Sequence, residues 1–392
     1  RRRVPRGEDV LMDVSLVMPC LNEERTVGIC VRKAQAALKA LGVAGEVIVA
    51  DNGSTDRSVE IARELGARVV AQPVKGYGAA LQAGIEASRG RIVVLGDADD
   101  SYDWGAIEPF VRKVEEGWDL VVGNRFEGGI LPGAMPWLHR YVGNPVLSAF
   151  TRIAFGVRLG DVHCGMRAFT RSAFERMRTA TSGMEFATEM VANAAHRGLR
   201  IAEVPTRLYP DKRDRAPHLR SFRDGWRHLR FILTYAPDHL YLVPGVGLLL
   251  AGLALQALLV AGPVRVAGQD LGIHYLALGA MLSLVGFNVI NLGVLAKAFM
   301  RQRYQSLESR TLALLSRHFS LEGGLVIGSL LMLAGLATDA VILAIRLAHP
   351  GEAMEGTVHL AFVATTMVVL GLNLVFTSFL LAMVLFSRRK ND

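Results

Sequence analysis

The sequence predicts a protein in two parts, an α/β domain built on a mostly parallel sheet and an all-α membrane domain of four transmembrane helices. Charge is one sign of this division: the 392 residues include 44 Lys and Arg and 36 Asp and Glu, but only 17 of these lie in 241–392. A second sign is the alternation of short apolar runs with amphipathic stretches through 13–123, which is typical of strand–helix units. The third is a set of four apolar stretches after residue 238, each near the roughly 20 residues that a bilayer-spanning helix needs.

The first part is expected to hold one sheet with helices on both faces. Apolar runs predict strands at 14–18, 47–50, 69–71 and 92–95, and the stretches between them predict helices at 23–40, 56–65 and 78–88. Polar residues follow the expected strands. Because ligands of open parallel sheets bind at the carboxyl ends of the strands, we expect the binding site along that edge.

The second part is expected to cross the membrane four times, near 241–262, 272–297, 325–347 and 358–386. Basic residues concentrate between the second and third spans and after the fourth, whereas the other two loops carry few. Basic loops stay on the cytosolic side. We therefore expect a multi-pass cell (plasma) membrane protein with its catalytic domain and both termini in the cytosol.

Two further segments have the pattern of basic amphipathic helices. In 220–236, Trp226 and Leu229 lie on one helical stripe and Arg223 and Arg227 on another, and 300–321 repeats the plan. Such helices can lie on an anionic membrane surface, although the charges also fit simple membrane anchors. The expected order along the chain is a tail at 1–12, the α/β domain at 13–219, a juxtamembrane helix at 220–238, a transmembrane hairpin at 239–299, an interfacial linker at 300–322, a second hairpin at 323–387 and a cytosolic tail at 388–392.

Four carboxylates gather directly after the expected strand at 92–95, at Asp97, Asp99, Asp100 and Asp103. Like charges this close repel unless a cation or protonation relieves them. Oxygen ligands at a strand end suit Mg²⁺ or Mn²⁺, which bridge such carboxylates to substrate phosphates. The alternative is a solvated acidic loop that caps a helix starting near Trp104.

Other classes of site lack their motifs. The chain has no G-x-x-x-x-G-K-[ST] segment, and Leu81 breaks the dinucleotide fingerprint that begins at Gly76 and Gly78, so neither a P-loop nor a Rossmann dinucleotide site is expected. His163 and Cys164 lack a second ligand pair at zinc spacing. The chain has three cysteines, a small and odd number, so a disulfide scaffold is not expected. Reduced thiols in the cytosol are the simplest interpretation. The pI of about 9.6 does not indicate nucleic-acid binding, because the basic residues follow the membrane edges.

Four segments together resemble family 2 glycosyltransferases with the GT-A fold. They are 14–24 (Val-Ser-Leu-Val-Met-Pro-Cys-Leu-Asn-Glu-Glu), 49–56 (Val-Ala-Asp-Asn-Gly-Ser-Thr-Asp), 75–79 (Lys-Gly-Tyr-Gly-Ala) and 97–99 (Asp-Ala-Asp). More narrowly, the chain resembles the dolichyl- and polyprenyl-phosphate sugar synthases over about 13–240, and membrane hairpins also suit that group. The resemblance implies a Rossmann-like domain that binds a nucleotide sugar.

The resemblance also implies roles for individual residues. It implies a metal motif at Asp97 and Asp99, and a donor site that includes Pro19, Glu23, Asp51, Lys75, Gly76, Gly78, Asp97 and Ala98. Its acceptor-phosphate candidates are Arg125, Arg167, Lys212, Arg213, Arg215, His218 and Arg220. Asp99, Arg125 and Glu189 are the catalytic candidates; Glu189 fits the family's acceptor-side acid better than Glu185. Glu189 is either a general base or a residue that orients a cation such as Arg167, and orientation is favoured.

The implied reaction is the inverting, metal-dependent transfer of a hexose from a nucleotide sugar to polyprenyl or dolichyl phosphate. UDP-glucose and GDP-mannose both fit as donors, and glucose is favoured. Three alternatives remain: transfer to another lipid acceptor, a processive polysaccharide synthase, and an inactive sugar-nucleotide-binding transporter subunit. The Q-x-x-R-W motif of processive synthases is absent, and the intact D-x-D motif argues against an inactive subunit. Membrane lipids are expected partners, nucleic acids are not, and a homo-oligomer is left open.

Overall fold

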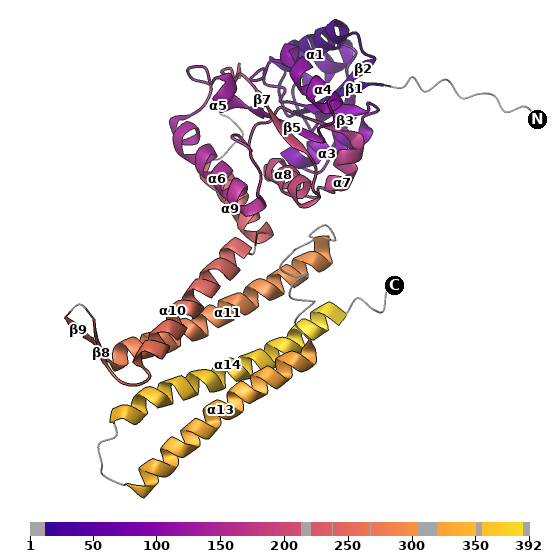
Figure 1. Ribbon diagram of the computed structural model, residues 1–392. Helices are drawn as coiled ribbons and strands as arrows, with labels where there is room; N and C mark the ends of the chain where they lie inside the picture. The colour runs from indigo at the N-terminus through magenta and orange to yellow at the C-terminus, as the bar shows by residue number, and fades with distance from the viewer. Residues whose placement is uncertain are drawn as a thin grey trace, which may run out of the picture. The chain divides into compact units, whose positions relative to one another are not determined.

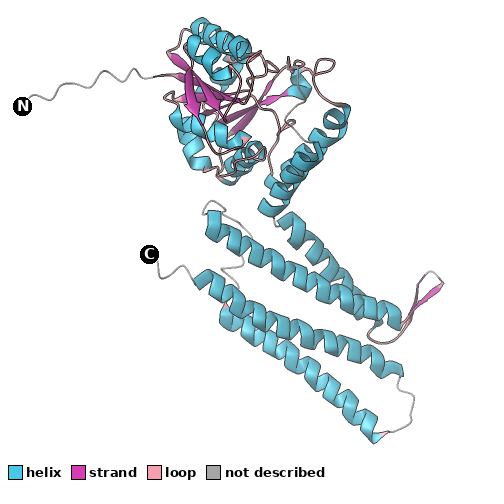
Figure 2. Ribbon diagram, turned by 180° about the vertical axis from the view of Figure 1, so that it is seen from behind, coloured by secondary structure: helices cyan, strands magenta, loops and turns pink. Residues whose placement is uncertain are grey.

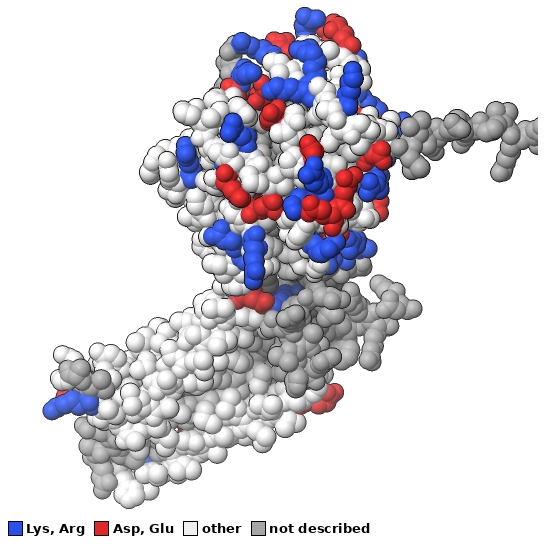
Figure 3. Space-filling model, turned by 45° about the horizontal axis from the view of Figure 1, so that its top comes forward, with Lys and Arg blue, Asp and Glu red and all other residues white. Residues whose placement is uncertain are grey.

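The structure, a computed structural model, describes residues 12–212, 221–236, 238–266, 268–304, 320–349 and 355–386. These residues form two compact units that divide between Tyr235 and Ala236, and each unit is described by itself (Figures 1 and 2). Charged side chains are dense on the first unit and sparse on the second in the face shown in Figure 3.

The first unit contains a seven-stranded sheet in the order β3-β2-β1-β4-β6-β5-β7. β6 runs antiparallel to both β4 and β5, and the other neighbours are parallel. The four strands expected from the sequence are confirmed as β1 to β4. The bounds are β1 Val14–Cys20, β2 Gly45–Asp51, β3 Arg68–Ala71, β4 Ile92–Leu95, β5 Leu120–Asn124, β6 Arg167–Thr170 and β7 Ile201–Pro205.

Helices cover both faces of this sheet, with α1 and α4 on one side and α3, α7 and α8 on the other (Figure 1). The first expected helix, at 23–40, begins later at Val27, because Glu23 to Thr26 form a turn in which Thr26 N–H donates to the Glu23 carbonyl at 3.0 Å. The helices of this unit are α1 Val27–Leu41, α2 Ser58–Glu64, α3 Tyr77–Ala87, η1 Trp104–Ala106, α4 Glu108–Glu115, α5 Arg125–Gly128, η2 His139–Gly143, α6 Asn144–Phe155, α7 Arg171–Met177, α8 Phe186–His196 and α9 Ser221–Tyr235.

The core follows the central strands. Leu16, Val17 and Met18 of β1 and the whole of β4 are buried, as strands covered by helices on both faces must be. The nearly continuous apolar runs of these strands therefore reflect burial on both sides.

The second unit contains four helices that are long and apolar enough to cross a membrane, at Asp238–Leu259, Ile273–Ala298, Leu321–Ala348 and Thr357–Met383. This confirms the expected all-α membrane domain of four transmembrane helices. The elements are η3 Asp238–Leu242, α10 Val243–Leu259, the hairpin strands β8 Val264–Val266 and β9 Gln269–Leu271, α11 Ile273–Tyr304, α13 Leu321–Ala348 and α14 Glu355–Phe386.

Glycines bring the helices of each hairpin into close contact. A Cβ at Gly252 of α10 would lie 2.5 Å from the Gly279 carbonyl of α11, and a Cβ at Gly335 of α13 would lie 2.6 Å from the Ala364 carbonyl of α14. Small residues at such contacts let helix backbones pack closely, which is the main source of attraction between helices in lipid. Residues 1–11 of the expected 1–12 tail, the expected 388–392 tail and most of the 300–322 linker lie outside the described residues.

Candidate active site

Donor-side residues meet at the carboxyl edge of the parallel strands. Cys20 of β1 pairs with Asp51 of β2, so the loops after both strands leave the sheet side by side. The buried carboxylate of Asp51 accepts hydrogen bonds of 3.0 Å from the backbone N–H groups of Gly53 and Ser54. Pro19 is half-buried in β1, and Glu23 is buried in the turn that follows. The structure thus brings Pro19, Glu23 and Asp51 together.

Asn52 fixes the next stretch of this edge. Its side-chain amide donates to the carbonyls of Gln72 (2.9 Å) and Val74 (2.8 Å), and its Oδ1 accepts from the Gly76 N–H (2.7 Å). Lys75 Nζ lies 2.6 Å from the Asn52 carbonyl oxygen. One amide therefore holds the Lys75–Gly76 segment against β2.

Gly76 and Gly78 are required by a close backbone approach. Gly76 has φ +146°, and a Cβ there would lie 2.1 Å from the Ser182 carbonyl oxygen; a Cβ at Gly78 would lie 2.5 Å from that of Thr181. The resemblance implied that these glycines admit the nucleotide. In the structure they admit the 181–183 loop, whose Ser182 carbonyl accepts a 3.1 Å hydrogen bond from Ala79 N–H.

The expected metal motif lies two residues beyond β4 and is held by hydroxyl groups. Tyr77 Oη donates to Asp97 Oδ1 at 3.1 Å, and Ser101 Oγ donates to Asp99 Oδ1 at 2.5 Å. Ala98 between them is buried, and Trp104 Nε1 donates to the Asp97 carbonyl at 3.0 Å. Burial, then the charge of Asp97, raises the pKa of Tyr77 well above its usual value, so the phenol stays a donor to that carboxylate.

Asp100 has different partners from the two carboxylates of the metal motif. It has φ +61°, and its buried carboxylate binds Lys33 Nζ at 2.7 Å and Lys212 Nζ at 2.6 Å. Burial alone would raise the pKa of Asp100, but the hydrogen bonds and charges of Lys212 and Lys33 hold it below its usual value. Lys212, an acceptor-phosphate candidate, is therefore paired with a carboxylate, although most of its side chain is exposed.

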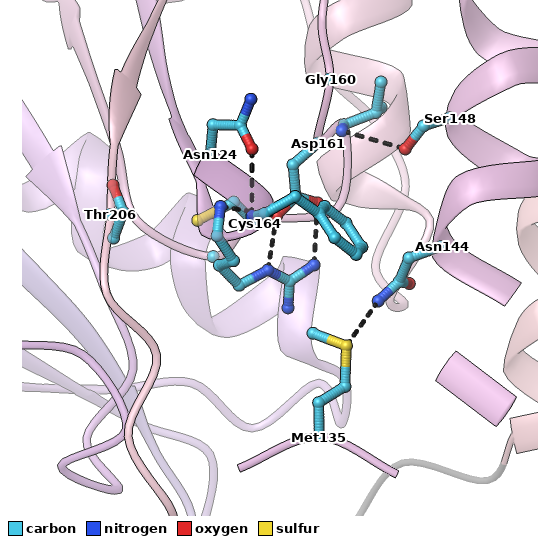
Figure 4. A network of polar contacts seen from close by, with 12 residues as sticks. Asn124, Met135, Asn144, Ser148, Gly160, Asp161, Cys164 and Thr206 are labelled. Carbon is cyan, nitrogen blue, oxygen red and sulfur yellow. Dashed lines mark hydrogen bonds and ion pairs between the residues drawn. The ribbon is translucent and has the colours of Figure 1, made fainter. Parts of the chain in front are cut away.

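Arg125 begins α5 and forms a buried ion pair with Asp161, which is labelled in Figure 4. Its Nε and Nη2 donate to the two carboxylate oxygens at 2.6 and 2.9 Å, and its backbone N–H donates to Oδ2 at 3.1 Å. Burial opposes the charge, but neighbouring Tyr102 and Asp161 raise the pKa of Arg125 well above its usual value. Arg125 therefore stays cationic, with its charge largely matched by Asp161.

The Asp161 loop also touches the metal motif. A Cβ at Gly165 would lie 2.9 Å from Asp97 Oδ2, and Gly165 N–H donates to Tyr102 Oη at 2.9 Å. One loop, 161–165, thus contacts both the donor-side carboxylate and Arg125.

Arg167 is turned into the interior, with 1% of its surface exposed. Its three guanidinium nitrogens donate to the carbonyls of Cys164 (2.9 Å), Ala187 (2.5 Å) and Val162 (2.6 Å). A direct contact with an acceptor phosphate would require this arrangement to change. In the structure, Arg167 ties the 161–165 loop to α8.

Glu189 is fully buried in α8 and holds the 180–183 loop. Its carboxylate accepts from the N–H groups of Ala180 and Thr181 and from Thr181 Oγ1, at 2.6 to 3.1 Å. Burial raises the pKa of Glu189 above its usual value. Its partners are therefore the loop that packs on Gly76 and Gly78, not Arg167.

Four acceptor-phosphate candidates, Arg213, Arg215, His218 and Arg220, lie outside the described residues. Among the residues that are described, no group of three His, Cys, Asp or Glu side chains could hold a metal ion. His163 contacts His228 of α9 edge to face at 4.7 Å between ring centroids, and burial lowers its pKa well below the usual value.

Comparison with known proteins identifies the family. The profile described as glycosyl transferase family 2 matches residues 15–178, and that of the glycosyltransferase family 2 C-terminal transmembrane region matches 294–385. The chain is 41% identical to the low-salt glycan biosynthesis hexosyltransferase Agl6 of Haloferax volcanii over 95% of this chain and 89% of that protein. The chain belongs to glycosyltransferase family 2.

Two further relatives of this glycosyltransferase carry names that specify a lipid phosphate. The dolichyl-phosphate hexose transferase of Haloferax volcanii is 34% identical over 49% of this chain and 81% of that protein. The dodecaprenyl-phosphate galacturonate synthase of Rhizobium johnstonii is 30% identical over 75% of this chain and 89% of that protein. Among solved structures, glucosyl-3-phosphoglycerate synthase from Mycobacterium tuberculosis matches with 26% identity and a TM-score of 0.45, covering 57% of this chain and 80% of that one.

These findings confirm three expectations. The glycosyltransferase has the expected GT-A class of α/β domain joined to apolar membrane helices, it is an enzyme, and it is a membrane protein. The alternative of an inactive transporter subunit is set aside by the family's named activities.

Sequence reasoning missed several residues that organise this site, although most lie inside motifs that it had noted. Tyr77, Asn52 and Ser101 each bond a candidate directly or hold its loop. These three residues could have been found from the sequence by their positions next to or near the candidate residues. Asp161 was assigned no role, because nothing in the sequence pairs it with a residue 36 positions earlier.

Proposed function

We propose that this glycosyltransferase transfers a hexose from a nucleotide sugar to a polyprenyl or dolichyl phosphate at the cytosolic face of the cell membrane, with inversion at the anomeric carbon. One observation carries the proposal: the 161–165 loop contacts Asp97 on the donor side and holds Arg125 through Asp161. A cation and a metal motif beside one loop suit a reaction between two phosphate-bearing substrates. The names of the relatives support a lipid phosphate as the acceptor.

The donor would bind along the carboxyl edge of β1, β2 and β4. Pro19, Glu23, Asp51, Lys75, Gly76, Gly78, Asp97 and Ala98 are the proposed donor-binding residues. UDP-glucose is the favoured donor and GDP-mannose the next. Asp51 is prepared for this role because two backbone N–H groups already hold its carboxylate in place.

A divalent cation, Mg²⁺ or Mn²⁺, would bind Asp97 and Asp99. The residues fit such an ion, since both side chains supply hard oxygen donors and each has one oxygen fixed by a neighbouring hydroxyl. Magnesium commonly uses only one or two protein carboxylates and takes its other ligands from water and substrate phosphates. When bound, the cation would neutralise charge on the departing nucleoside diphosphate.

The acceptor is itself the nucleophile. A phosphate monoester has a second pKa of about 6, so its oxygen is anionic near neutral pH and needs little help from a base. That oxygen forms the new bond to the anomeric carbon while the bond from that carbon to the diphosphate breaks. Arg125 and the basic residues at 212–220 would hold the acceptor against the repulsion of the donor, so that positioning and electrostatics supply most of the catalysis.

Glu189 would position the site and not act as an essential base. Its carboxylate is fully buried and accepts hydrogen bonds from the 180–181 backbone. That loop in turn packs on Gly76 and Gly78. The proposed role is therefore to fix the loop that shapes the donor side.

A substrate panel tests the proposal. Full-length protein in nanodiscs is given labelled nucleotide sugars one at a time, with either polyprenyl phosphate or diacylglycerol, and the lipid product is identified by mass spectrometry. A hexose joined to polyprenyl phosphate from one preferred donor is expected. A product on diacylglycerol, or no lipid-linked sugar from any donor, would contradict it.

A further inference from the structure

Two histidines join the 161–165 loop of the site to α9. His163 lies in that loop and His228 lies in α9, and their rings pack edge to face with 4.7 Å between the centroids. On its other side, His228 Nδ1 lies 2.8 Å from Thr188 Oγ1 of α8, and both of these residues are buried. The proposed reaction gives neither histidine a role.

The backbone on both sides of His163 is held by one arginine. Val162 and Cys164 flank His163 in the chain. Arg167 donates to both of their carbonyls, at 2.6 and 2.9 Å. The same guanidinium donates to the Ala187 carbonyl of α8 at 2.5 Å. The loop is therefore tied to α8 through its backbone, and it contacts α9 through the ring of His163.

His228 belongs to the side of α9 that packs on the rest of the first unit, where α9 contacts α6 and α8. Four buried residues of α9 follow the i, i+3, i+4, i+7 spacing of one helix face, and they are His228, Phe231, Ile232 and Tyr235. Three of them are large apolar or aromatic side chains. The residue of this face that contacts the loop is instead a histidine.

Packing alone does not account for a histidine at position 163. Both ring nitrogens of His163 are buried, and neither has a hydrogen-bond partner among the described residues. A buried polar group without a partner costs about 1–3 kcal/mol, and a phenylalanine ring would fill a similar space without that cost. A histidine differs from phenylalanine in that its ring can take up a proton.

The surroundings of His163 oppose a proton on its ring. Burial lowers the pKa of His163 well below its usual value. The titratable or charged groups that act on this ring from other elements lower the pKa too, and they are His228 of α9, Arg125 of α5 and Arg167 of β6. The ring is therefore neutral while the loop stays in place, and protonation favours an arrangement in which the ring leaves its site.

We propose that His163 and His228 are positioning residues that hold the 161–165 loop in its catalytic arrangement, and that they do so only while the His163 ring is neutral. The loop carries Asp161, the partner of Arg125, and it contacts the metal motif. Acid would then release the loop and with it the position of the Arg125 guanidinium. The catalytic part of this inference rests on the proposed function, whereas the acid sensitivity of the loop does not.

Hydrogen exchange tests the acid sensitivity without an activity assay. Three backbone N–H groups report on the loop because each donates to a side chain of another segment: those of Asp161, Val162 and Gly165, which donate to Glu203, Ser148 and Tyr102. A released histidine ring titrates near pH 6.5, so lowering the pH from about 7.5 to about 5.5 should favour the open loop about tenfold. Protection factors from mass spectrometry of peptides that cover 161–165, with the whole chain in nanodiscs, should fall by the same factor.

The decisive variant is His163→Phe, which keeps an aromatic ring against His228 and removes the titrating group, so the acid-induced fall in protection should disappear. His196→Phe is the matched control, because His196 of α8 also packs edge to face on an aromatic ring, that of Phe155, at 5.4 Å between centroids. This control should keep the fall. His163→Met replaces the first variant if that one folds poorly, since methionine adapts to irregular spaces. No fall in the wild type, or an equal fall in His163→Phe, would overturn the proposal.

Kinetics separate positioning from a direct role of the histidine nitrogens. At about pH 7.5, His163→Ala should lower kcat/KM for polyprenyl phosphate tenfold or more, because a misplacement of about 1 Å can cost about 10²-fold. His163→Phe should restore most of this loss, since it restores the ring contact. Normal kcat/KM in His163→Ala, or an equal loss in both variants, would contradict a positioning role. If the wild type itself transferred no hexose, the proposed function would fail, and the exchange measurement would still decide whether a neutral His163 holds the loop.

Discussion

At the scale of single residues, the two carboxylates of the metal motif differ from the carboxylates beside them. Asp97 and Asp99 each have one oxygen fixed by a hydroxyl, whereas Asp100 binds two lysines and Asp103 caps η1 through a 3.0 Å bond from Gly105 N–H. Four acidic residues in seven positions thus have three different roles. The sequence could not separate these roles, because they depend on which way each side chain faces.

Asp99→Asn should abolish turnover while leaving the fold intact. The amide keeps an oxygen for the Ser101 bonds but removes the charge that would hold the cation, so a loss of at least about 10²-fold in kcat is expected. Sugar transfer to polyprenyl phosphate at saturating Mn²⁺ measures it. Asp103→Asn is the matched control and should stay near wild type, because Asn caps a helix as well as Asp. Full activity of the wild type in EDTA would show that no cation is needed.

Glu189→Gln should lower kcat less than about tenfold, since an essential general base contributes about 10²–10⁴. Burial raises the pKa of Glu189 above its usual value, so the folded state binds this proton more tightly than the unfolded state. The contribution of Glu189 to stability is therefore fully present below the usual glutamate pKa, about 4.3, and is lost as pH rises through the folded value. As pH rises through the folded pKa of Glu189, the melting temperature of the wild type should therefore fall relative to that of Glu189→Gln, which has no group that titrates at this position. A larger loss of kcat at unchanged melting temperature would support a base instead.

At the scale of elements, Asp100 joins three segments that are far apart in sequence. It links the metal-motif loop to Lys33 of α1 and to Lys212, which lies where the proposed acceptor loop begins. The same segments are paired by a 2.9 Å hydrogen bond from Tyr209 N–H to the Ser101 carbonyl. The metal motif and the chain entering the acceptor loop therefore form one local structure.

Asp100→Asn should destabilise the protein by about 2 kcal/mol, the usual worth of hydrogen bonds to a buried charged group. Asn tolerates the positive φ of this position, so the backbone conformation should persist. Thermal unfolding measures stability, and the KM for the lipid phosphate should rise while the KM for the donor stays constant. Glu60→Gln breaks an exposed ion pair with Arg57 and should change stability by less than about 0.5 kcal/mol. If Asp100→Asn and Glu60→Gln changed stability by the same amount, the pairing of Asp100 with its two lysines would contribute no more than an exposed ion pair.

The membrane hairpins depend on glycines at their contacts. Gly252→Ala would place a Cβ 2.4 Å from the Ser283 backbone nitrogen, so α10 and α11 must separate and the hairpin should lose stability. Gly247→Ala lies in the same helix with nothing within 4 Å, and it should be neutral or slightly stabilising because Ala is the better helix former. Unfolding in detergent measures both. If Gly247→Ala were as damaging as Gly252→Ala, the close contact would not be the cause.

Elements with strong periodicity could be predicted from the sequence, and those set by tertiary contacts could not. The apolar runs of β1 to β4 and the four spans were readable because each pattern reports local burial. The antiparallel insertion of β6 between β4 and β5 was not, because residues 167–170 lie over 70 positions from their partners in β4. Distance along the chain also hid the contact of Gly76 with Ser182. The inward turn of Arg167 was hidden for another reason, because its partners are backbone carbonyls, which leave no mark in the sequence. The exposure of apolar side chains on α6, such as that of Phe150, was also missed, since apolar spacing alone indicates a core-facing helix.

At the scale of the whole molecule, the distribution of charge bears on the topology. The 263–271 and 348–357 loops hold few basic residues, whereas 297–317 and 388–390 hold many. With four spans, an even number, both termini must lie on one side. From the positive-inside rule we propose that this side is the cytosol, where nucleotide sugars would meet the catalytic unit.

Single-cysteine labelling tests this topology. Gln269→Cys in β9 and His349→Cys after α13 should react with a membrane-impermeant maleimide on intact cells, because both positions are exposed and belong to the sparsely basic loops. Glu60→Cys on the catalytic unit should react only after lysis or in inside-out vesicles. The buried native thiols provide a low background. Labelling of residue 60, but not of residues 269 and 349, on intact cells would place the catalytic unit outside the cytosol. The topology inferred from the basic loops would then be wrong. Labelling of all three positions from one side would instead contradict a crossing by the first span, which separates residue 60 from residue 269.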